Sequence, residues 1–326
     1  MSKDNSVPSP ESIQSLLEVI AAGSNFVAIH PLEGDFSNST HLIDARASDG
    51  SLFQVVTRRY AIFGDYDRGE KARREFKTLQ FLKKHGSPVP EPLYLDDTGE
   101  ILGSPGIVTQ FMPGKLIMAQ PYPTQWAEIL AKTLAQIHII PINDTDTSFL
   151  LDGNSEALWF LKSKDSVPKY ISTHPKGMAL WQAMMDYIPK QIGVEPALVH
   201  IDYWSGNILW DKEAISAIVD WEEASQGDPG IDVAYCRMDM ILCGMDEAAD
   251  KFLAVYEKET GKPVSNLGFW ELAAAVRPMF HPEGWISESP SKERFADFVD
   301  TAIQRTRLYS TLSKAQGGIG KKREVE

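Results

Sequence analysis

A short polar segment between two apolar runs carries the residues of this chain that are best suited to chemistry. In LVHIDYWSGNILW, residues 198–210, a histidine, an aspartate and an asparagine stand at His200, Asp202 and Asn207. The later run AISAIVDW brings a second carboxylate at Asp220. Two carboxylates and one amide on neighbouring segments suit a divalent cation beside a general base, because Mg²⁺ prefers oxygen ligands and shares them with substrate phosphates.

The pattern H-x-D-x-x-x-x-N also has a purely structural interpretation. Aspartate and asparagine are common in turns, so the segment could be a turn in which His200 bonds a backbone carbonyl. The context of the segment favours chemistry. Strand-like runs flank the loop and Asp220 ends a following strand, which is the arrangement that a phosphotransferase requires.

The elements around this segment predict two lobes. The expected elements before residue 112 are helices over residues 10–22 and 68–86 and strands near 26–31, 41–46, 52–60, 93–95 and 107–111. Helical periodicity dominates the later chain, except in a strand-like island at residues 197–221. We therefore predict an α+β chain with a small antiparallel-sheet N-lobe, residues 1–112, and a larger, mostly helical C-lobe, residues 113–326.

The composition limits the partners and the compartment. The 326 residues include 32 basic and 45 acidic side chains, and the net charge of -13 argues against binding to a nucleic-acid backbone. No apolar run approaches the roughly 20 residues that cross a bilayer. The polar start MSKDNSVPSP does not read as a signal peptide. We expect a cytoplasmic protein that binds neither membranes nor nucleic acids.

The ordered motifs resemble the aminoglycoside phosphotransferase family, whose members are relatives of choline kinase with a protein-kinase-like fold. The resemblance rests on HIDYWSGNILW and AIVDWEEASQGDPGIDVAY and extends, in the family's order, to GDFSNSTHLI, RREFKTLQFLKKHGSPVPEP, TQFMPG and LAKTLAQIH. It covers most of residues 31–256. The resemblance implies a bilobal protein-kinase-like fold, a Mg²⁺ ion and ATP or GTP as co-substrate.

The resemblance also implies roles for the residues of the polar segment. Asp202 is similar to the catalytic base that accepts the proton of the substrate hydroxyl as this hydroxyl attacks the γ-phosphate, and Asn207 and Asp220 are similar to the Mg²⁺ ligands. His200 is expected to orient the loop backbone rather than to transfer a proton. Ile201 departs from the family, which usually has glycine there.

One carboxylate of the predicted N-lobe helix requires a partner. Glu75 falls on the apolar stripe of that helix, four residues before Leu79, and an inward carboxylate is costly unless it is paired. The strand FQVVTRRY offers Arg58 or Arg59. Side-chain alternation does not decide between them, because both faces of the strand carry apolar neighbours. The resemblance favours Arg58, at the place of the phosphate-binding lysine of kinases.

Two weaker motifs complete the nucleotide site that the resemblance implies. EGDFSNST resembles the turn over the phosphates, with Ser37 and Asn38 near its end. TQFMPG resembles the lobe connector, in which backbone groups from Gln110 to Met112 hydrogen-bond adenine. Taken alone, the first motif is a hairpin turn and the second is the end of a strand.

Several residues of the predicted C-lobe have expected roles that follow from their chemistry or from the resemblance. Asp228, which precedes a proline, is expected to cap a helix, and Asp232 is expected to tie that helix to the catalytic loop. Trp270, Phe280 and Trp285 lie where the family builds its acceptor pocket, although core packing is the commoner use of such side chains.

These observations predict a phosphotransferase that moves the γ-phosphate of ATP or GTP to a hydroxyl of a small molecule, such as an aminoglycoside-like amino sugar or another small alcohol. The alternative is a catalytically silent nucleotide-binding regulator of the same fold, which Ile201 favours. A metal-dependent hydrolase that uses His200 and Asp202 lacks the further histidines of such sites. The acceptor, the choice of nucleotide and the oligomeric state are left open.

Overall fold

Two hydrophobic cores form in this chain, one around an antiparallel sheet and the other among helices. The computed structural model describes residues 7–32, 38–61, 67–117, 122–123, 125–142, 147–162, 166–286 and 289–317. The first unit comprises Met1–Pro123, Asp146–Leu150 and Gly206–Ala224, and the second comprises Thr124–Thr145, Leu151–Ser205 and Ser225–Glu326. The predicted α+β class is confirmed, while the lobe boundary after residue 112 stays a prediction.

The first unit is built on a five-stranded antiparallel sheet with the order β1-β2-β3-β5-β4. Its strands are β1 (Asn25–Pro31), β2 (Ser39–Arg46), β3 (Leu52–Arg59), β4 (Pro92–Asp96) and β5 (Gly106–Gln110). The turn between β2 and β3 is closed by Asp49, whose carboxylate accepts a hydrogen bond from the Ser51 N–H at 2.9 Å. This local turn fixes the pairing of the two strands that border the site.

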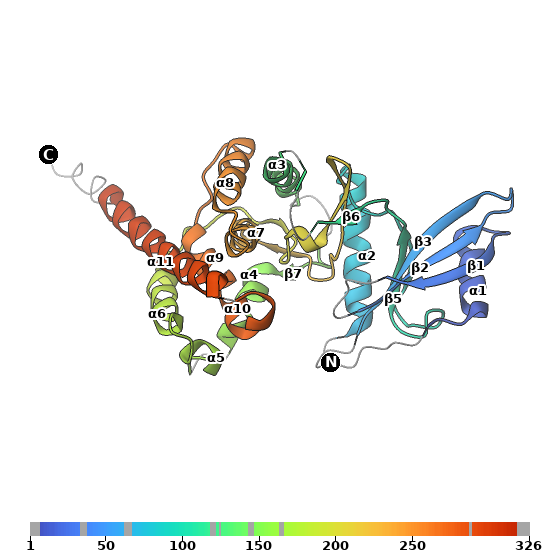
Figure 1. Ribbon diagram of the computed structural model, residues 1–326, viewed down its shortest axis with the longest axis horizontal. Helices are drawn as coiled ribbons and strands as arrows, with labels where there is room; N and C mark the ends of the chain where they lie inside the picture. The colour runs from blue at the N-terminus through green and yellow to red at the C-terminus, as the bar shows by residue number, and fades with distance from the viewer. Residues whose placement is uncertain are drawn as a thin grey trace. The chain divides into compact units, whose positions relative to one another are not determined.

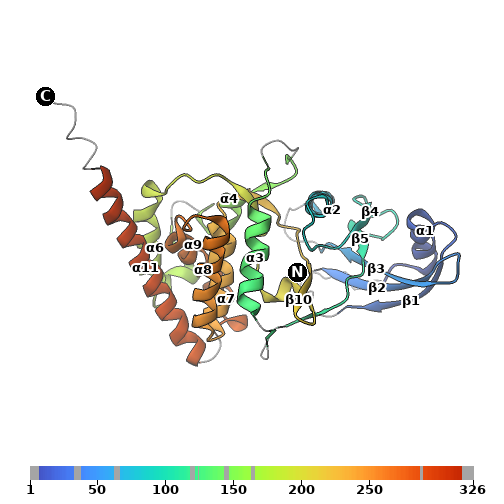
Figure 2. The same ribbon diagram turned by 90° about the horizontal axis from the view of Figure 1, so that it is seen from above.

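Two helices cover opposite faces of this sheet, α1 (Pro10–Ile20) and α2 (Arg68–Lys84) (Figure 1; Figure 2). Ser9 caps α1 by accepting a hydrogen bond from the Ser12 N–H at 3.1 Å. Ile13, Leu16 and Leu17 of α1 then form a buried cluster with residues of the sheet, namely Ile43, Ala45, Val55 and Val108, and with Leu102. The second helix begins at the Asp67 cap and carries Glu75 on its buried face.

The two expected metal ligands flank the hairpin of a smaller sheet of the first unit. This sheet has the order β10-β9-β6, with β6 (Lys115–Leu116), β9 (Ile208–Asp211) and β10 (Ala214–Ile218). The tight β9–β10 turn contains Lys212 in the left-handed conformation, with φ of 55°. This hairpin places Asn207 directly before β9 and Asp220 two residues after β10.

The second unit is mostly helical, with one short sheet. The sheet has the order β7-β11-β8, formed by β7 (Leu151–Asp152), β8 (Ala197–Val199) and β11 (Ser225–Gly227). The helices are α3 (Trp126–His138), α4 (Gly153–Ala157), α5 (Lys169–Ser172), α6 (Gly177–Tyr187), α7 (Gly230–Leu242), α8 (Asp246–Thr260), α9 (Leu267–Ala274), α10 (Val276–Phe280) and α11 (Ser289–Gly317). Four 3₁₀ turns complete the described elements, at Trp159–Lys162, Ile188–Lys190, Ser205–Asn207 and Pro282–Gly284.

Helix α7 lies in the middle of the second core, because nearly all its side chains are buried. It begins at Gly230, one residue later than the predicted start at Pro229, and Asp228 accepts a hydrogen bond from the Gly230 N–H at 2.8 Å. The predicted N-cap position of Asp228 is thus wrong by one residue, because Pro229 occupies it, although the Asp228 carboxylate still accepts a hydrogen bond from the first helical N–H. Within the described residues, no helix combines the length and apolar character needed to cross a membrane.

A buried ion cluster ties three helices of this unit together. Glu271 of α9 is fully buried and pairs with Arg237 of α7 at 3.2 Å and with Arg305 of α11 at 2.5 Å. The two guanidinium groups compensate the desolvated carboxylate, which would otherwise be costly in a helical core. The cluster thereby holds the three helices together.

The packing of α1 predicts a difference between two substitutions on the same helix. Leu16→Ala should lower the free energy of unfolding by about 2–5 kcal/mol, because the fully buried leucine leaves a cavity. Val19→Ala should change it by less than about 0.5 kcal/mol, because Val19 is 62% exposed. Urea unfolding of the full chain, followed by circular dichroism, measures both. Equal losses would contradict the packing of α1 on the sheet.

Candidate active site

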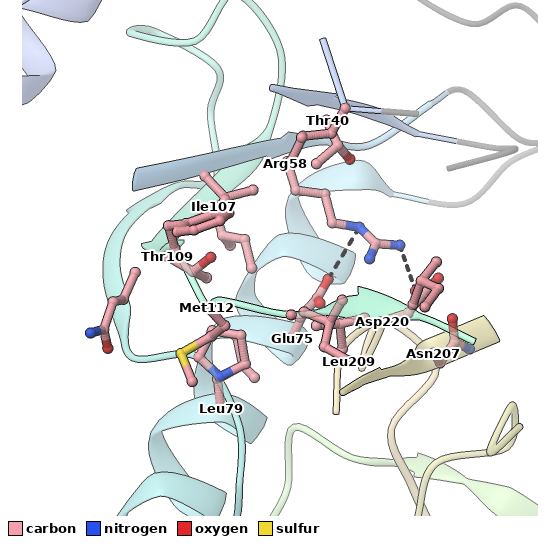
Figure 3. A pocket seen from close by; sticks show the side chains of 18 of the residues that line it. Thr40, Arg58, Glu75, Leu79, Ile107, Thr109, Met112, Asn207, Leu209 and Asp220 are labelled. Carbon is pink, nitrogen blue, oxygen red and sulfur yellow. Dashed lines mark hydrogen bonds and ion pairs between the residues drawn. The ribbon is translucent and has the colours of Figure 1, made fainter. Parts of the chain in front are cut away.

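A pocket of about 350 Å³ opens in the first unit, and all the residues that line it belong to that unit. Its apolar walls come from several strands and from α2: Leu32, Val56, Leu79, Pro90, Ile107, Leu116, Leu209 and Val219. Figure 3 shows Arg58, Asn207 and Asp220 at one side of the pocket and Thr109 and Met112 at the other. The pocket thus combines an apolar middle with one strongly charged end.

Arg58 is the centre of the charged end. Its Nη2 atom lies 2.5 Å from Oδ1 of Asp220 and its Nε atom lies 3.7 Å from Oε2 of Glu75 (Figure 3). The same Nη2 atom lies 3.5 Å from Oε2 of Glu222. One guanidinium therefore meets three carboxylates from α2 and from the chain after β10. The Arg58 side chain is only 12% exposed, so these charges act through a medium less polar than water.

Arg59 turns away from the pocket. It is 2% exposed, and its Nη1 atom donates a hydrogen bond to the Leu102 carbonyl at 3.3 Å. Neighbouring residues of a strand point to opposite faces of a sheet, so only one of the two arginines can face Glu75. The geometry therefore selects Arg58, the residue that the resemblance favoured.

Glu75 is held by two further donors. The Tyr60 hydroxyl donates a hydrogen bond to its Oε2 atom, and the Trp221 N–H donates one to its Oε1 atom at 3.2 Å. Burial, reinforced by the charge of Glu75, raises the pKa of Tyr60 well above its ordinary value, so the phenol remains a donor. The expectation that Glu75 faces inward and needs a cationic partner is confirmed.

Another carboxylate, Glu222, contacts side chains from α2 and from Asn38, the residue before β2. The Asn38 amide donates a hydrogen bond to Glu222 Oε2 at 2.9 Å, and Lys71 Nζ lies 3.3 Å from Oε1. Arg74 Nε donates to the Glu222 carbonyl at 2.7 Å. Asn38, predicted to contact nucleotide, is thus only 2% exposed and held in this network, whereas Ser37 lies outside the described residues.

The predicted connector residues border the opposite side of the pocket. Gln110 ends β5, and its N–H donates a hydrogen bond to the Glu91 carbonyl at 2.9 Å. Met112 follows two residues later, and both residues line the pocket. The geometry therefore brings six of the predicted residues to one pocket, namely Arg58, Glu75, Gln110, Met112, Asn207 and Asp220.

The donor set of this pocket suits a hard cation that is shared with a substrate. Asn207 and Asp220 offer oxygen atoms, and a hydrogen bond of 3.0 Å from the Val219 N–H to the Asn207 carbonyl ties their two segments together. Within the described part of the chain, no group of three or more histidine, cysteine, aspartate or glutamate side chains could hold a metal. Two oxygen ligands fit Mg²⁺, which takes its other ligands from phosphates and water.

In the second unit, Asp232 organises the loop that follows β8. Its carboxylate accepts hydrogen bonds from the N–H groups of His200 and Ile201 at 2.7 and 2.8 Å. His138 Nε2 lies 3.1 Å from the same carboxylate, which is fully buried. The prediction that Asp232 ties α7 to the loop is confirmed.

The two residues before Asp202 have structural features of their own. His200 is fully buried, and its Nδ1 atom accepts a hydrogen bond from the Asp202 N–H at 3.3 Å. Ile201 is in the left-handed conformation, with φ of 74°. A β-branched residue pays about 1–2 kcal/mol for this conformation, which glycine adopts freely. The loop therefore keeps its shape at Ile201 at an energetic cost.

Asp202 lies among groups that sequence reasoning missed. Arg277 Nη1 donates a hydrogen bond to its Oδ1 atom at 2.9 Å, and Tyr235 forms another hydrogen bond with it. Asp239 of α7 is 7% exposed, and burial, together with the charge of Asp202, raises its pKa to about 7. Arg277 stands 75 residues after Asp202, so no local pattern could have indicated the contact.

The three aromatic residues expected near an acceptor pocket have different environments. Trp270 is 2% exposed and belongs to the core, whereas Phe280 is 45% exposed. The ring of Trp285 lies 5.9 Å, between centroids, from the rings of both Trp204 and Tyr235. Of the three, Trp285 thus reaches the surroundings of Asp202 through Tyr235.

Comparison with known sequences gives a clear family match. A family model described as "Phosphotransferase enzyme family" matches residues 28–265. Acyl-CoA dehydrogenase family member 10 of Mus musculus is 27% identical over 182 residues, which are 50% of this chain and 16% of the mouse protein. The matched region thus corresponds to about a sixth of a much longer relative.

Comparison with solved structures supports the fold. A macrolide 2'-phosphotransferase from Brachybacterium faecium aligns with a TM-score of 0.57 and 19% identity, over 89% of this chain and 98% of the other. A spectinomycin phosphotransferase, solved with ADP and spectinomycin, aligns with a TM-score of 0.59 and 14% identity, over 92% and 98% of the two chains. The kinase-like fold that the resemblance implied is confirmed.

The raised pKa of Asp239 predicts a pH-dependent stability. Its folded pKa of about 7 lies above the ordinary value of 3.8, so the folded chain binds this proton more tightly than the unfolded chain. The stabilisation is complete below pH 3.8 and is lost as the pH rises through 7, by about 4 kcal/mol in all. Asp239→Asn should therefore raise the melting temperature strongly at pH 8 and much less at pH 5.

The control for this measurement is Asp186→Asn, which changes an exposed carboxylate of the same unit. Thermal unfolding of both variants and of the wild type at pH 5 and pH 8 gives the comparison. A melting-temperature difference for Asp239→Asn that is the same at both pH values would contradict the assignment of a buried, ionising carboxyl.

Proposed function

We propose that this chain, which belongs to the phosphotransferase enzyme family, transfers the γ-phosphate of ATP or GTP to a hydroxyl of a small molecule. The observation that carries the proposal is the charged end of one apolar pocket, where Arg58, Glu75 and Asp220 meet beside Asn207. Phosphoryl transfer mostly needs positioning and charge neutralisation, and this set of groups supplies both.

In the proposed complex, the apolar walls of the pocket hold the purine ring of the nucleotide and the charged end receives its phosphates. Backbone groups near Gln110 and Met112 border the end of the pocket that receives the purine ring. Arg58 grips a phosphate with its planar fork, while Glu75 keeps the guanidinium in place. A Mg²⁺ ion held by Asn207 and Asp220 would neutralise charge that develops on the phosphates.

Asp202 is the proposed general base. It accepts the proton of the acceptor hydroxyl while the oxygen–phosphorus bond forms and the nucleoside diphosphate leaves. His200 braces the backbone N–H of Asp202, and Asp232 fixes the two preceding N–H groups. These contacts support a positioning role for His200 rather than proton transfer.

The acceptor is proposed at the level of its class. A solved relative with the same fold carries spectinomycin in its name and another carries macrolide, so hydroxylated small molecules are the first candidates, amino sugars and other small alcohols included. The two free cysteines, Cys236 and Cys243, are compatible with a cytoplasmic reaction. A silent regulator is disfavoured, because Ile201 adopts the left-handed conformation that a glycine would supply.

The central test is Asp202→Asn in a screen with ATP or GTP, Mg²⁺ and a panel of aminoglycosides, macrolides, sugars and amino alcohols. Thermal shifts in the presence of Mg²⁺–ADP select compounds, and transfer of labelled γ-phosphate is then measured. The variant should lower kcat by about 10²–10⁴-fold, because it removes the base, and should leave the nucleotide Kd unchanged. Asp186→Asn is the matched control. Wild-type turnover by the variant would exclude Asp202 as the base.

Arg58 gives a second, independent prediction. Arg58→Met should raise the Kd for Mg²⁺–ADP by at least about tenfold, since a charge-assisted contact to phosphate contributes about 1.5–3 kcal/mol. Arg58→Lys should bind with intermediate affinity, and Arg46→Met, at an exposed end of β2, should bind like the wild type. Titration with a fluorescent nucleotide measures all three. Unchanged affinity in a folded Arg58→Met variant would place the phosphates elsewhere.

A further inference from the structure

Helix α10 brings an arginine against the loop that carries the proposed base. Arg277 Nη1 donates a hydrogen bond to Asp202 Oδ1 at 2.9 Å, and Arg277 Nη2 donates one to the Ile201 carbonyl at 3.0 Å. One planar fork therefore contacts a side chain and the adjacent backbone at the same time. Such two-point contacts fix direction as well as distance.

Arg277 is itself held in place. Its Cζ atom lies 4.4 Å from the centroid of the Tyr235 ring, a distance typical of a cation–π contact. Tyr235 also hydrogen-bonds Asp202, and its ring lies 5.9 Å from that of Trp285. The guanidinium, the carboxylate and the phenol thus form a closed triangle of contacts, which restricts the rotation of each group.

The exposure of this ion pair indicates what it contributes. The side chains of Arg277 and Asp202 are 27% and 29% exposed, so water screens their attraction and the pair adds little to stability. Its larger effect is geometric. The carboxylate of Asp202 cannot turn without breaking the contact at Oδ1, and the strained Ile201 cannot relax without breaking the contact at its carbonyl.

We infer that Arg277 is a positioning residue for the proposed base: it fixes the carboxylate of Asp202 and the left-handed backbone at Ile201 in the orientation that receives the acceptor's proton. The inference rests on the proposed function, in which Asp202 is the base. Arg277 acts through Asp202 and not on the nucleotide. Its loss should therefore lower kcat and leave the KM for ATP unchanged.

The experiment measures hydrolysis of Mg²⁺–ATP, with water as the acceptor, by the full chain. Arg277→Ala should lower kcat by about 10²-fold, the loss expected when a catalytic group is misplaced by about 1 Å. Arg277→Lys, which keeps the charge but not the fork, should recover part of the rate. Millimolar guanidinium should raise kcat of Arg277→Ala. Arg294→Ala is the matched control, because Arg294 contacts the Leu242 carbonyl in the same unit and not the loop.

Double substitution separates this inference from the proposed function. Asp202→Asn combined with Arg277→Ala should be no slower than Asp202→Asn alone, because the arginine acts through the aspartate. A further loss in the double variant would overturn the positioning role. If Asp202→Asn keeps wild-type hydrolysis, the base assignment and the proposed mechanism fail. If Asp202→Asn loses hydrolysis while Arg277→Ala keeps it, only the inference about Arg277 fails.

If thermal unfolding shows that Arg277→Ala does not fold, two further variants test the positioning role of Arg277. Arg277→Lys preserves the charge and most of the side-chain volume, and it should show a reduced kcat at an unchanged KM. Tyr235→Phe keeps the ring beneath Arg277 and removes only the hydroxyl that contacts Asp202. It should also lower kcat selectively. Wild-type kcat in both folded variants would overturn the inference.

Discussion

The candidate site depends first on the attraction between one guanidinium and the three carboxylates around it. Glu75, Asp220 and Glu222 come from different segments of the first unit, and Arg58 is the cation that meets all three. Without that cation, the inward-facing carboxylates would repel one another in a poorly solvated region. The sheet, α2 and the β9–β10 hairpin are therefore held around the pocket by charge as well as by apolar packing. The same requirement explains why β3 carries an arginine at the edge of a mostly apolar pocket.

The second unit also buries a carboxylate, but there backbone N–H groups compensate its charge. There Asp232, fully buried on α7, accepts hydrogen bonds from two backbone N–H groups of the loop and lies beside His138. A carboxylate that accepts several backbone hydrogen bonds fixes a loop more firmly than side-chain packing does, because each bond restrains the main chain itself. The long-range cluster around Glu271 then holds the helices that surround α7. In both units, buried charges set the geometry and apolar contacts fill the space around them.

The sequence predicted those parts of the site that have a local signature. The loop from His200 to Asn207 and the inward position of Glu75 follow from spacing and helical periodicity. The choice between Arg58 and Arg59 does not follow from the sequence, because β3 has apolar neighbours on both faces. Only the contact with Glu75 of α2 identifies Arg58 as the residue that faces the pocket. Arg277 and Asp239 had no signal, since tertiary folding alone brings them to Asp202 from positions far along the chain. Sequence patterns thus locate the proposed catalytic and metal-binding residues, whereas only the fold shows which distant residues contact them.

The left-handed backbone at Ile201 has a consequence for how substitutions in the loop combine. A glycine at this position would keep the same conformation without help, whereas the isoleucine relies on a hydrogen bond from Arg277 to its carbonyl. Loss of the arginine should therefore destabilise the loop more when position 201 is isoleucine than when it is glycine. The contact of Arg277 with the Asp202 carboxylate is lost in both cases, so only the backbone part of its effect depends on residue 201.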